Sequence, residues 1–366
     1  MSKIPVKVCI IGPVAPPNGG MALQGQLLKK LLQSDDIEVD YLAVNFPLKP
    51  KFLNHCRGLR AFLRLCVYIK YLWQATKTRP VLHILANSGW SWHLFSAPAI
   101  IIGQLRKCKV IINYRGGGAD KFFKRQAKFI FPVLRRADTI IVPSVYLQQI
   151  FEKYNFKADV VPNIIAQSPI IQKNKSNLQG EPFIFVVTRN LEEIYGIHTI
   201  IDAMKLLQED YSNFILKIAG SGPCLKMLEA QAKNLGLSDK IVFCGRLNRT
   251  QMQALYHNAD IMINASTVDN MPNALLEALS YGVPIISTRV GGIPYMVEHM
   301  KTAILVEPQN AKAIKIALMQ VIQDSVLRAR LSENGLKSAK QYTWANIGPQ
   351  WKQYYALGCN RETSHG

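Results

Sequence analysis

The sequence predicts an α/β protein made of two Rossmann-like domains, each built on a parallel sheet. The chain has 366 residues, which is room for two or three domains with their own cores. Short apolar runs that end in glycine-rich loops recur along both halves and alternate with segments of helical periodicity. Between the halves, residues 167–182 are polar and lack a strand pattern, which is typical of a linker.

The first expected strand is the apolar run that follows Lys7 and ends at Gly12. The loop after it contains three prolines and the pair Gly19-Gly20, and a helix is expected from about residue 22 to 33. A glycine-rich loop between strand and helix favours phosphate binding or the close approach of a ligand. The loop lacks the G-x-G-x-x-G spacing of dinucleotide-binding proteins, so a tight turn without a ligand is the alternative.

A second strand is expected over residues 37–44, and a helix over residues 57–79. This helix has an apolar side and a basic side, formed by Leu59, Phe62, Cys66, Ile69 and Trp73 and by Arg57, Arg60 and Arg64. We expect the apolar side to pack on the sheet, and a helix lying on a membrane surface is the alternative.

Residues 81–105 are the one stretch to test as a membrane span. Polar residues and a glycine interrupt it from Asn87 to His93, so we expect a strand over 81–86, a loop and a buried helix. The fourth strand, 110–114, leads into the run from Arg115 to Gly118, at the strand end where α/β sheets bind ligands. Further short apolar runs occur within residues 137–144 and 160–163.

The second strand–helix series begins at Phe183, and its strand ends carry Arg189 and the loops 220–223 and 245–247. A strand, loop, helix and second strand then follow between Asn264 and Glu298. In that stretch Pro272 suits the first turn of the helix, and Gly282 followed by Pro284 ends it. The N–H groups at this helix N-terminus are suited to phosphate, and they belong to Asn273, Ala274 and Leu275.

The charge of the chain is concentrated in its first half. The formal charge is +20, and residues 1–165 contain 15 Lys and 9 Arg against 8 acidic residues, which is +16. Such a field fits an anionic partner: nucleic acid, a phospholipid surface or a phosphorylated acceptor. No nucleic-acid recognition module is present, so we expect no nucleic-acid partner.

The seven cysteines form no C-x-x-C pair, and most lie in apolar runs. We therefore expect buried thiols in a reducing cytosol. No signal peptide pattern precedes the first strand, which agrees with a cytoplasmic location. No cluster of Asp or His with metal-ligand spacing is present, so we expect no metal site.

The stretch from Asn264 to Glu298 resembles the retaining glycosyltransferases of class 4 (group 1), which have the two-Rossmann-domain GT-B fold. That family has a Glu, seven residues and a second Glu here, followed by Gly-x-Pro and a Gly-Gly turn. This chain matches that pattern in order with Asp269, Glu277, Gly282, Pro284, Gly291 and Gly292. The resemblance covers roughly residues 5–356.

The resemblance implies an acceptor-side domain over residues 1–168, a linker over 169–182 and a nucleotide-sugar domain over 183–341. A helix within 342–366 would cross back to the first domain. The two domains would face each other across a cleft.

The resemblance also implies the site residues. Glu277 would accept hydrogen bonds from the ribose hydroxyls, and Asp269 would face the sugar. The donor-binding residues that it implies are Gly19, Gly20, Arg189, Gly222, Arg246, Leu247, Asn273, Ala274, Leu275 and Glu277. The catalytic residues that it implies are Arg189, Asp269 and Arg115, and the acceptor-side residues are Arg115, Gly116 and Gly117.

Two positions depart from the family pattern. Tyr195 stands where relatives have a Lys that binds the diphosphate together with the preceding Arg, so Arg189 must carry more of the phosphate charge. Arg115 stands where many relatives have a His, so the proton chemistry of a histidine does not carry over.

The implied activity is retaining, metal-independent transfer of a hexosyl group, without a further cofactor. The donor would be a UDP- or GDP-linked sugar, and the acceptor a lipid-linked or glycan molecule in polysaccharide or glycoconjugate synthesis. Because the first half of the chain is basic, we also expect the protein to bind an anionic membrane surface, at the inner face of the membrane. The alternatives are a sugar-nucleotide epimerase and a catalytically weak nucleotide-binding protein on the same fold.

Overall fold

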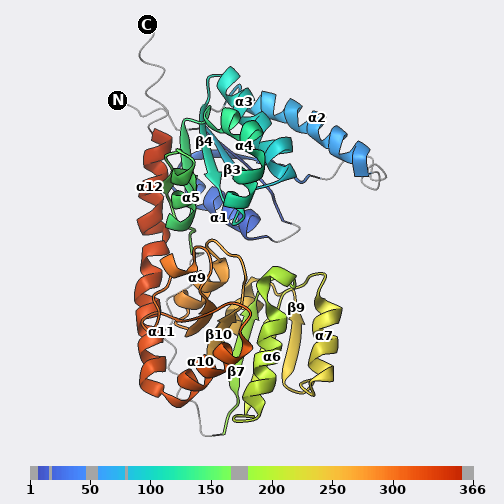
Figure 1. Ribbon diagram of the computed structural model, residues 1–366. Coiled ribbons are helices and arrows are strands. Elements are labelled where there is room, and N and C mark those ends of the chain that lie inside the picture. Colours follow the sequence, from blue (N-terminus) through green and yellow to red (C-terminus); the bar gives the residue numbers. More distant parts are fainter. Residues whose placement is uncertain (1–6, 16–18, 47–56, 79–80, 166–179, 357–366) are drawn as a thin grey trace. The chain divides into compact units, whose positions relative to one another are not determined.

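The computed structural model describes residues 7–15, 19–46, 57–78, 81–165 and 180–356, with the backbone alone for 57–62. Contacts divide the chain into two compact units. The first unit is Met1–Ile164 with Trp344–Gly366, and the second unit is Ile165–Thr343. Each unit contains a six-stranded parallel sheet with helices packed on it (Figure 1), so the predicted fold class is confirmed. Most of the predicted linker lies outside the described residues.

The sheet of the first unit has the strand order β2-β1-β3-β4-β5-β6. Its strands are β1 (Lys7–Gly12), β2 (Glu38–Ala43), β3 (Val81–Ala86), β4 (Lys109–Tyr114), β5 (Thr139–Val142) and β6 (Asp159–Val160). All residues of β3 and β4 are buried, as expected for central strands of a parallel sheet that is covered on both faces. The direction of progression along the sheet reverses after β2, which places a topological switch point between β1 and β3.

Helices cover both faces of this sheet. One face packs against α1 (Gly20–Ser34) and α12 (Trp344–Ala356). The other face packs against α2 (Arg57–Ala75), the π-helix η2 (Trp92–Ser96), α3 (Ala97–Leu105), α4 (Ala119–Leu134) and α5 (Val145–Lys153). Crossovers between parallel strands are right-handed, so the direction in which a connection runs along the sheet decides which face its helix covers. The connection from β1 to β2 runs in one direction and the later connections run in the other, so α1 lies on the opposite face from α2, α3, α4 and α5.

The side of α2 that packs on the sheet is not the predicted one. Tyr68 and Leu72 are fully buried, whereas Cys66 is exposed and Ile69 and Trp73 are 38% and 43% exposed. Apolar residues occur on several sides of this helix, so their spacing did not single out the buried side, and the prediction is off by one residue. Part of the predicted pattern lies outside the described side chains, namely Arg57, Leu59, Arg60 and Phe62.

Two further expectations concern buried segments. Residues 81–105 fold as a strand, a loop and helical turns, as predicted. Within the described part of the chain, no helix has the length and apolar character needed to cross a bilayer.

The prediction of mostly buried thiols is wrong for the described cysteines, because Cys9 and Cys108 are buried but Cys66 is exposed and Cys224 and Cys244 are half-buried. The remaining cysteines lie outside the described residues, at positions 56 and 359.

The sheet of the second unit has the order β12-β11-β10-β7-β8-β9. Its strands are β7 (Phe183–Thr188), β8 (Phe214–Ala219), β9 (Ile241–Gly245), β10 (Ile261–Asn264), β11 (Ile285–Thr288) and β12 (Ile304–Val306). In chain order this is the 3-2-1-4-5-6 arrangement of the Rossmann fold, with its switch point between β7 and β10. Ligands of such sheets bind beyond the carboxyl ends of the strands at that point.

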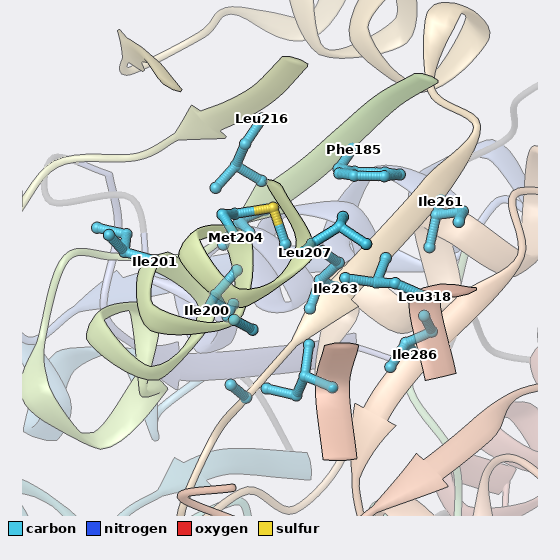
Figure 2. Packing of buried hydrophobic residues seen from close by; sticks show 14 of the residues in the cluster. Phe185, Ile200, Ile201, Met204, Leu207, Leu216, Ile261, Ile263, Ile286 and Leu318 are labelled. Carbon is cyan, nitrogen blue, oxygen red and sulfur yellow. The ribbon is translucent and has the colours of Figure 1, made fainter. Parts of the chain in front are cut away.

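Two cores hold the second sheet. Its helices are α6 (Ile197–Gln208), α7 (Leu225–Asn234), α8 (Arg249–Asn258), α9 (Asn273–Ser280), α10 (Ala311–Gln323) and α11 (Ser325–Ala339). Figure 2 shows one core, in which Met204 and Leu207 of α6 lie among Phe185, Ile263 and Leu318, all of them fully buried. The other core joins α8 and α9 to the opposite face of the sheet. With both faces packed, the loops at the carboxyl edge start from fixed positions.

Candidate active site

An ion pair lies at the switch point of the second sheet. Arg189 follows β7, and its Nη2 atom donates to Oδ2 of Asp269, in the loop after β10, at 2.5 Å. The two side chains are only 11% and 13% exposed, so the pair is largely shielded from water. The Nε–H of Arg189 is buried and has no hydrogen-bond partner among the described residues. An unpaired buried donor on a cation is a ready position for an anionic ligand.

The loop that carries Asp269 is fixed by its neighbours. The Ser266 hydroxyl donates to Oδ2 of Asp269 at 3.2 Å, and the N–H of Asn270 donates to Oδ1 at 3.0 Å. The N–H of Gly292 donates to the main-chain oxygen of Asp269 at 3.1 Å. A Cβ on Gly291 or Gly292 would lie 1.9 Å from a carbonyl oxygen of this loop, so the Gly-Gly turn is required for close backbone contact.

Tyr195 lies against Arg189. The centre of the guanidinium group is 4.1 Å from the centroid of the Tyr195 ring, which is cation–π geometry. Tyr195 ends the short 3-10 helix η3 (Glu193–Tyr195), and the next residue, Gly196, has φ of 61°. A Cβ on Gly196 would lie 2.1 Å from the Ala265 carbonyl oxygen. Burial raises the pKa of Tyr195, so the ring in contact with Arg189 is neutral.

Glu277, on α9, is held by a tyrosine that the sequence analysis missed. The hydroxyl of Tyr256, on α8, donates to Oε2 of Glu277 at 3.0 Å. The Thr188 hydroxyl is 2.7 Å from the same tyrosine oxygen, and because the carboxylate is the stronger acceptor, Thr188 donates to Tyr256. Burial raises the pKa of Glu277, while the Tyr256 hydrogen bond and the charge of Arg189 oppose that shift. No local sequence pattern marks Tyr256, because the contact joins positions 21 apart.

The loops after β8 and β9 adjoin the same edge. Nε of Arg246 donates to the Ser221 hydroxyl at 2.5 Å, although Arg246 is exposed. The N–H of Leu191 donates to the Ser221 carbonyl oxygen at 3.1 Å, which joins the loop of Arg189 to the loop of Gly222. A Cβ on Gly222 would lie 2.3 Å from the Leu191 carbonyl oxygen, and Leu247 packs against the core. The structure therefore brings these predicted residues to one edge of the sheet.

The α9 N-terminus differs in one detail from the expectation. The N–H of Leu275 donates to the Pro272 carbonyl oxygen at 3.2 Å, because the first turn of the helix is tight. Leu275 is also fully buried, so its N–H is not available to a phosphate. The other two predicted residues, Asn273 and Ala274, are the first two residues of α9.

In the first unit, Arg115 is committed to an internal network. It donates from Nη1 to Oδ1 of Asn113 at 3.4 Å and from Nη2 to Oδ1 of Asn163. Asn113 contacts Nε2 of His83 at 3.1 Å, and Nδ1 of His83 lies 2.7 Å from the Tyr355 hydroxyl of α12. Burial lowers the pKa of Arg115 to about 10 and that of His83 to about 3, so Arg115 is charged and His83 neutral near pH 7. These contacts show Arg115 joining the end of β4 to the chain exit of the first unit.

A cavity of about 60 Å3 lies at the switch point of the first sheet. Its walls come from the ends of β1 and β3, the start of α1 and η2, and include Pro13, Met21, Ser91 and Phe95. The predicted pair Gly19-Gly20 begins α1 at the same edge of the sheet.

The glycines after β4 lie in a loop at the same edge of the first sheet. A Cβ on Gly116 would lie 2.5 Å from Oδ1 of Asn87, so this glycine lets the loop after β4 contact the loop after β3. Gly117 is the next residue and is half-buried. Across the described parts of both units, no three His, Cys, Asp or Glu side chains gather closely enough to hold a metal ion.

The sequence of the second unit matches a known family. The family Glycosyl transferases group 1 matches residues 170–338. An uncharacterized glycosyltransferase of Methanocaldococcus jannaschii is 31% identical over 196 residues, which are 53% of this chain and 50% of that protein. The lipopolysaccharide core biosynthesis glycosyltransferase LpsE of Rhizobium meliloti is 24% identical over 239 residues, 63% of this chain and 67% of that protein. The chain spans about half the length of the first curated relatives that it matches.

Solved glycosyltransferase structures share the fold over nearly the whole chain. The sucrose-phosphate synthase of Thermosynechococcus elongatus superposes with a TM-score of 0.74 at 18% identity, covering 96% of this chain and 98% of that one. Anabaena HepE in complex with UDP-glucose superposes with a TM-score of 0.74 at 17% identity, covering 96% and 99%. Residues 170–338 therefore match the group 1 glycosyltransferase family, and the chain as a whole shares the GT-B fold of these solved structures.

Proposed function

We propose that the protein transfers a hexosyl group from a nucleotide-sugar to a lipid-linked or glycan acceptor, with retention of anomeric configuration. The observation that carries this proposal is the meeting of Arg189, Asp269 and Glu277 at the carboxyl edge of the family-matched domain, around its switch point. The second unit would bind the donor. The first unit, with its cavity at the other switch point, would bind the acceptor.

Glu277 is proposed to bind the ribose of the donor. Tyr256 occupies one acceptor position on Oε2, which leaves Oε1 for a ribose hydroxyl. This partly buried hydrogen bond holds the carboxylate in place before the donor binds, so binding loses little side-chain entropy.

Arg189 is proposed to bind the diphosphate through its unpartnered Nε–H. Tyr195 and Asp269 hold the guanidinium group from two sides, so its charge is in place when negative charge develops on the leaving group. Because Oδ2 of Asp269 already accepts from Arg189 and Ser266, Asp269 is suited to orienting Arg189 rather than to removing a proton. The departing phosphate would take the proton of the acceptor hydroxyl as the new glycosidic bond forms on the face that it leaves.

The relatives support the choice of substrates. HepE was solved with UDP-glucose, and LpsE is named for lipopolysaccharide core biosynthesis. We therefore propose a UDP- or GDP-linked hexose as donor. A lipid-linked or glycan acceptor, reached at the inner face of an anionic membrane, fits the +16 charge of residues 1–165.

Thermal shift with UDP- and GDP-linked hexoses tests the donor, since a ligand at 100 times its Kd stabilises a protein by about 2.7 kcal/mol. The stabilising donor is then incubated with and without a lipid-linked acceptor, and the product is analysed by NMR for its anomeric configuration. We expect an acceptor-dependent product with the configuration of the donor, unchanged by a chelator. Free epimerised sugar without acceptor would establish the epimerase, and binding without turnover would establish the nucleotide-binding protein.

A further inference from the structure

The outer side of α4 is uniformly basic. Its exposed cations, with those directly after the helix, are Lys121, Lys124, Arg125, Lys128, Arg135 and Arg136. Asp120 is the single acidic residue from position 119 to 137, and it pairs with Lys153 at 2.7 Å. The residues of α4 that face the core lie opposite, with Phe123, Ile130 and Leu134 fully buried. Asp120, at the start of α4, also lies in the field of Lys124, and no other acidic residue of this helix offsets the remaining cations.

Two large aromatic side chains are exposed to solvent near these cations. Phe129, on α4, is 74% exposed, and Trp90, in the loop after β3, is 79% exposed. The Trp90 ring lies 6.3 Å from the His93 ring, and Nε2 of His93 contacts Oε1 of Gln126 on α4 at 2.5 Å. The His93 ring also lies 6.1 Å from the Phe122 ring of α4. Trp90 therefore lies next to α4, the helix that carries Phe129, and we call the surface formed by the exposed cations, Phe129 and Trp90 the α4 surface.

We propose that the α4 surface, formed by the exposed cations of α4 together with Phe129 and Trp90, docks on an anionic phospholipid bilayer. Cations attract the negatively charged headgroups, and aromatic rings among them are favourable at the boundary between headgroups and acyl chains. A single-stranded RNA could also pair with the cations and stack its bases on the rings, but the proposed transfer to a lipid-linked acceptor favours the bilayer, and RNA binding in place of vesicle binding would overturn the proposal. A bilayer satisfies both features at once.

The position of the α4 surface agrees with a role in acceptor binding. Ser91, which follows Trp90 in the chain, lines the cavity at the switch point of the first sheet. Docking through Trp90 would therefore bring the cavity of the acceptor-side unit next to the bilayer. This inference rests on the proposed transfer to a membrane acceptor, and it places the contact on α4 rather than on the basic side of α2 that the sequence suggested.

Co-sedimentation with vesicles tests the docking directly. Wild-type protein should bind vesicles of phosphatidylcholine with about one-third phosphatidylglycerol, and not vesicles of phosphatidylcholine alone. The double variant Arg125→Glu/Lys128→Glu should lower the partition coefficient by at least roughly 30-fold, since each basic residue near the surface contributes about 1 kcal/mol and each Glu adds repulsion. The double variant Lys226→Glu/Lys233→Glu, on exposed positions of α7, is the matched control and should bind as wild type.

The aromatic residues need their own test. Trp90→Ser/Phe129→Ser should lose the binding that remains when salt screens the charges, whereas Val326→Ser, at a position 74% exposed on α11, should not. Donor binding by calorimetry should be unchanged in all of these variants, so a protein that docks but binds no donor would refute the proposed function alone. Equal binding to neutral and anionic vesicles, or binding lost in Ile69→Ser/Trp73→Ser but kept in the α4 variants, would overturn the α4 proposal.

Discussion

Replacing Tyr256 by Phe removes one oxygen atom, which is the only side-chain donor to the Glu277 carboxylate among the described residues. The lost hydrogen bond is 3.0 Å long and ends on a buried carboxylate, and bonds of this kind contribute about 1.5–3 kcal/mol. If Glu277 binds the ribose in its ionised form, donor affinity should fall roughly 10- to 150-fold near neutral pH. The pKa of Glu277 should also rise further, because burial already raises it and Tyr256 is the first of the two groups that oppose the shift.

The assay is calorimetric titration of the donor at a series of pH values. In wild-type protein, affinity should increase as pH rises through the pKa of Glu277, and in Tyr256→Phe the midpoint should move to higher pH. Arg189 is the other charged group that acts on Glu277, and it is present in both proteins. Tyr342→Phe, a buried tyrosine of the same core, is the control. A variant that melts at a lower temperature but keeps the wild-type midpoint would show that Tyr256 only packs.

Other substitutions address the ion pair, the Gly-Gly turn and the buried acid. Arg189→Ala should lower kcat more than donor affinity and, by leaving Asp269 unpaired, cost about 3–5 kcal/mol of stability; adding Asp269→Asn should restore the melting temperature but not turnover. Tyr195→Phe should keep kcat, because the ring still contacts Arg189, whereas Tyr195→Ala should lower it about 2- to 30-fold, and equal rates would contradict the orienting role. Gly292→Ala should lower both stability and donor affinity, measured by urea unfolding and calorimetry, since its Cβ would meet the Asn270 carbonyl oxygen. Because burial raises the pKa of Glu277 above 4.5, the free energy of unfolding should fall as pH rises from that value through the folded-state pKa, and Glu277→Gln should remove this part of the pH dependence.

The order of strands and helices was predictable because glycine loops and apolar runs are local features. The strands at 7–12, 81–86 and 183–188 are each mostly apolar, so their sequences indicate buried strands without knowledge of the tertiary packing. The orientation of α2 was not predictable in the same way. With Tyr68 and Trp73 both on the helix, only the shape of the core beneath it selects which of them is buried.

The site shows the same difference. Arg189, Asp269 and Glu277 could be selected from motif spacing, but their partners could not. The contact of Glu277 with Tyr256 and the stacking of Tyr195 on Arg189 depend on how separate loops meet at the sheet edge. Motif spacing therefore predicts which residues lie at the site, whereas the side chains that contact them can be identified only from the structure.

The roles of the glycines at the edge of the second sheet were predicted only in part. Gly222, after β8, was expected to contact the donor, whereas Gly291 and Gly292, after β11, were expected to form a turn. The structure shows Gly222 and Gly292 allowing one backbone segment to approach another. Gly222 and Gly292 each lie against a carbonyl oxygen of a neighbouring loop. Sequence alone does not distinguish these two reasons, because both require the absence of a Cβ.

The central claim is that the switch point between β7 and β10 binds a nucleotide-sugar through Glu277 and Arg189. Calorimetric titration of UDP- and GDP-linked hexoses into wild-type protein and Glu277→Gln tests it most directly. We expect one donor site in the wild type and an affinity loss of about 1.5–3 kcal/mol in Glu277→Gln, with the melting temperature of the unliganded variant no lower than that of the wild type near neutral pH. Equal affinity of the two proteins for the donor would remove Glu277 from the site and contradict the account.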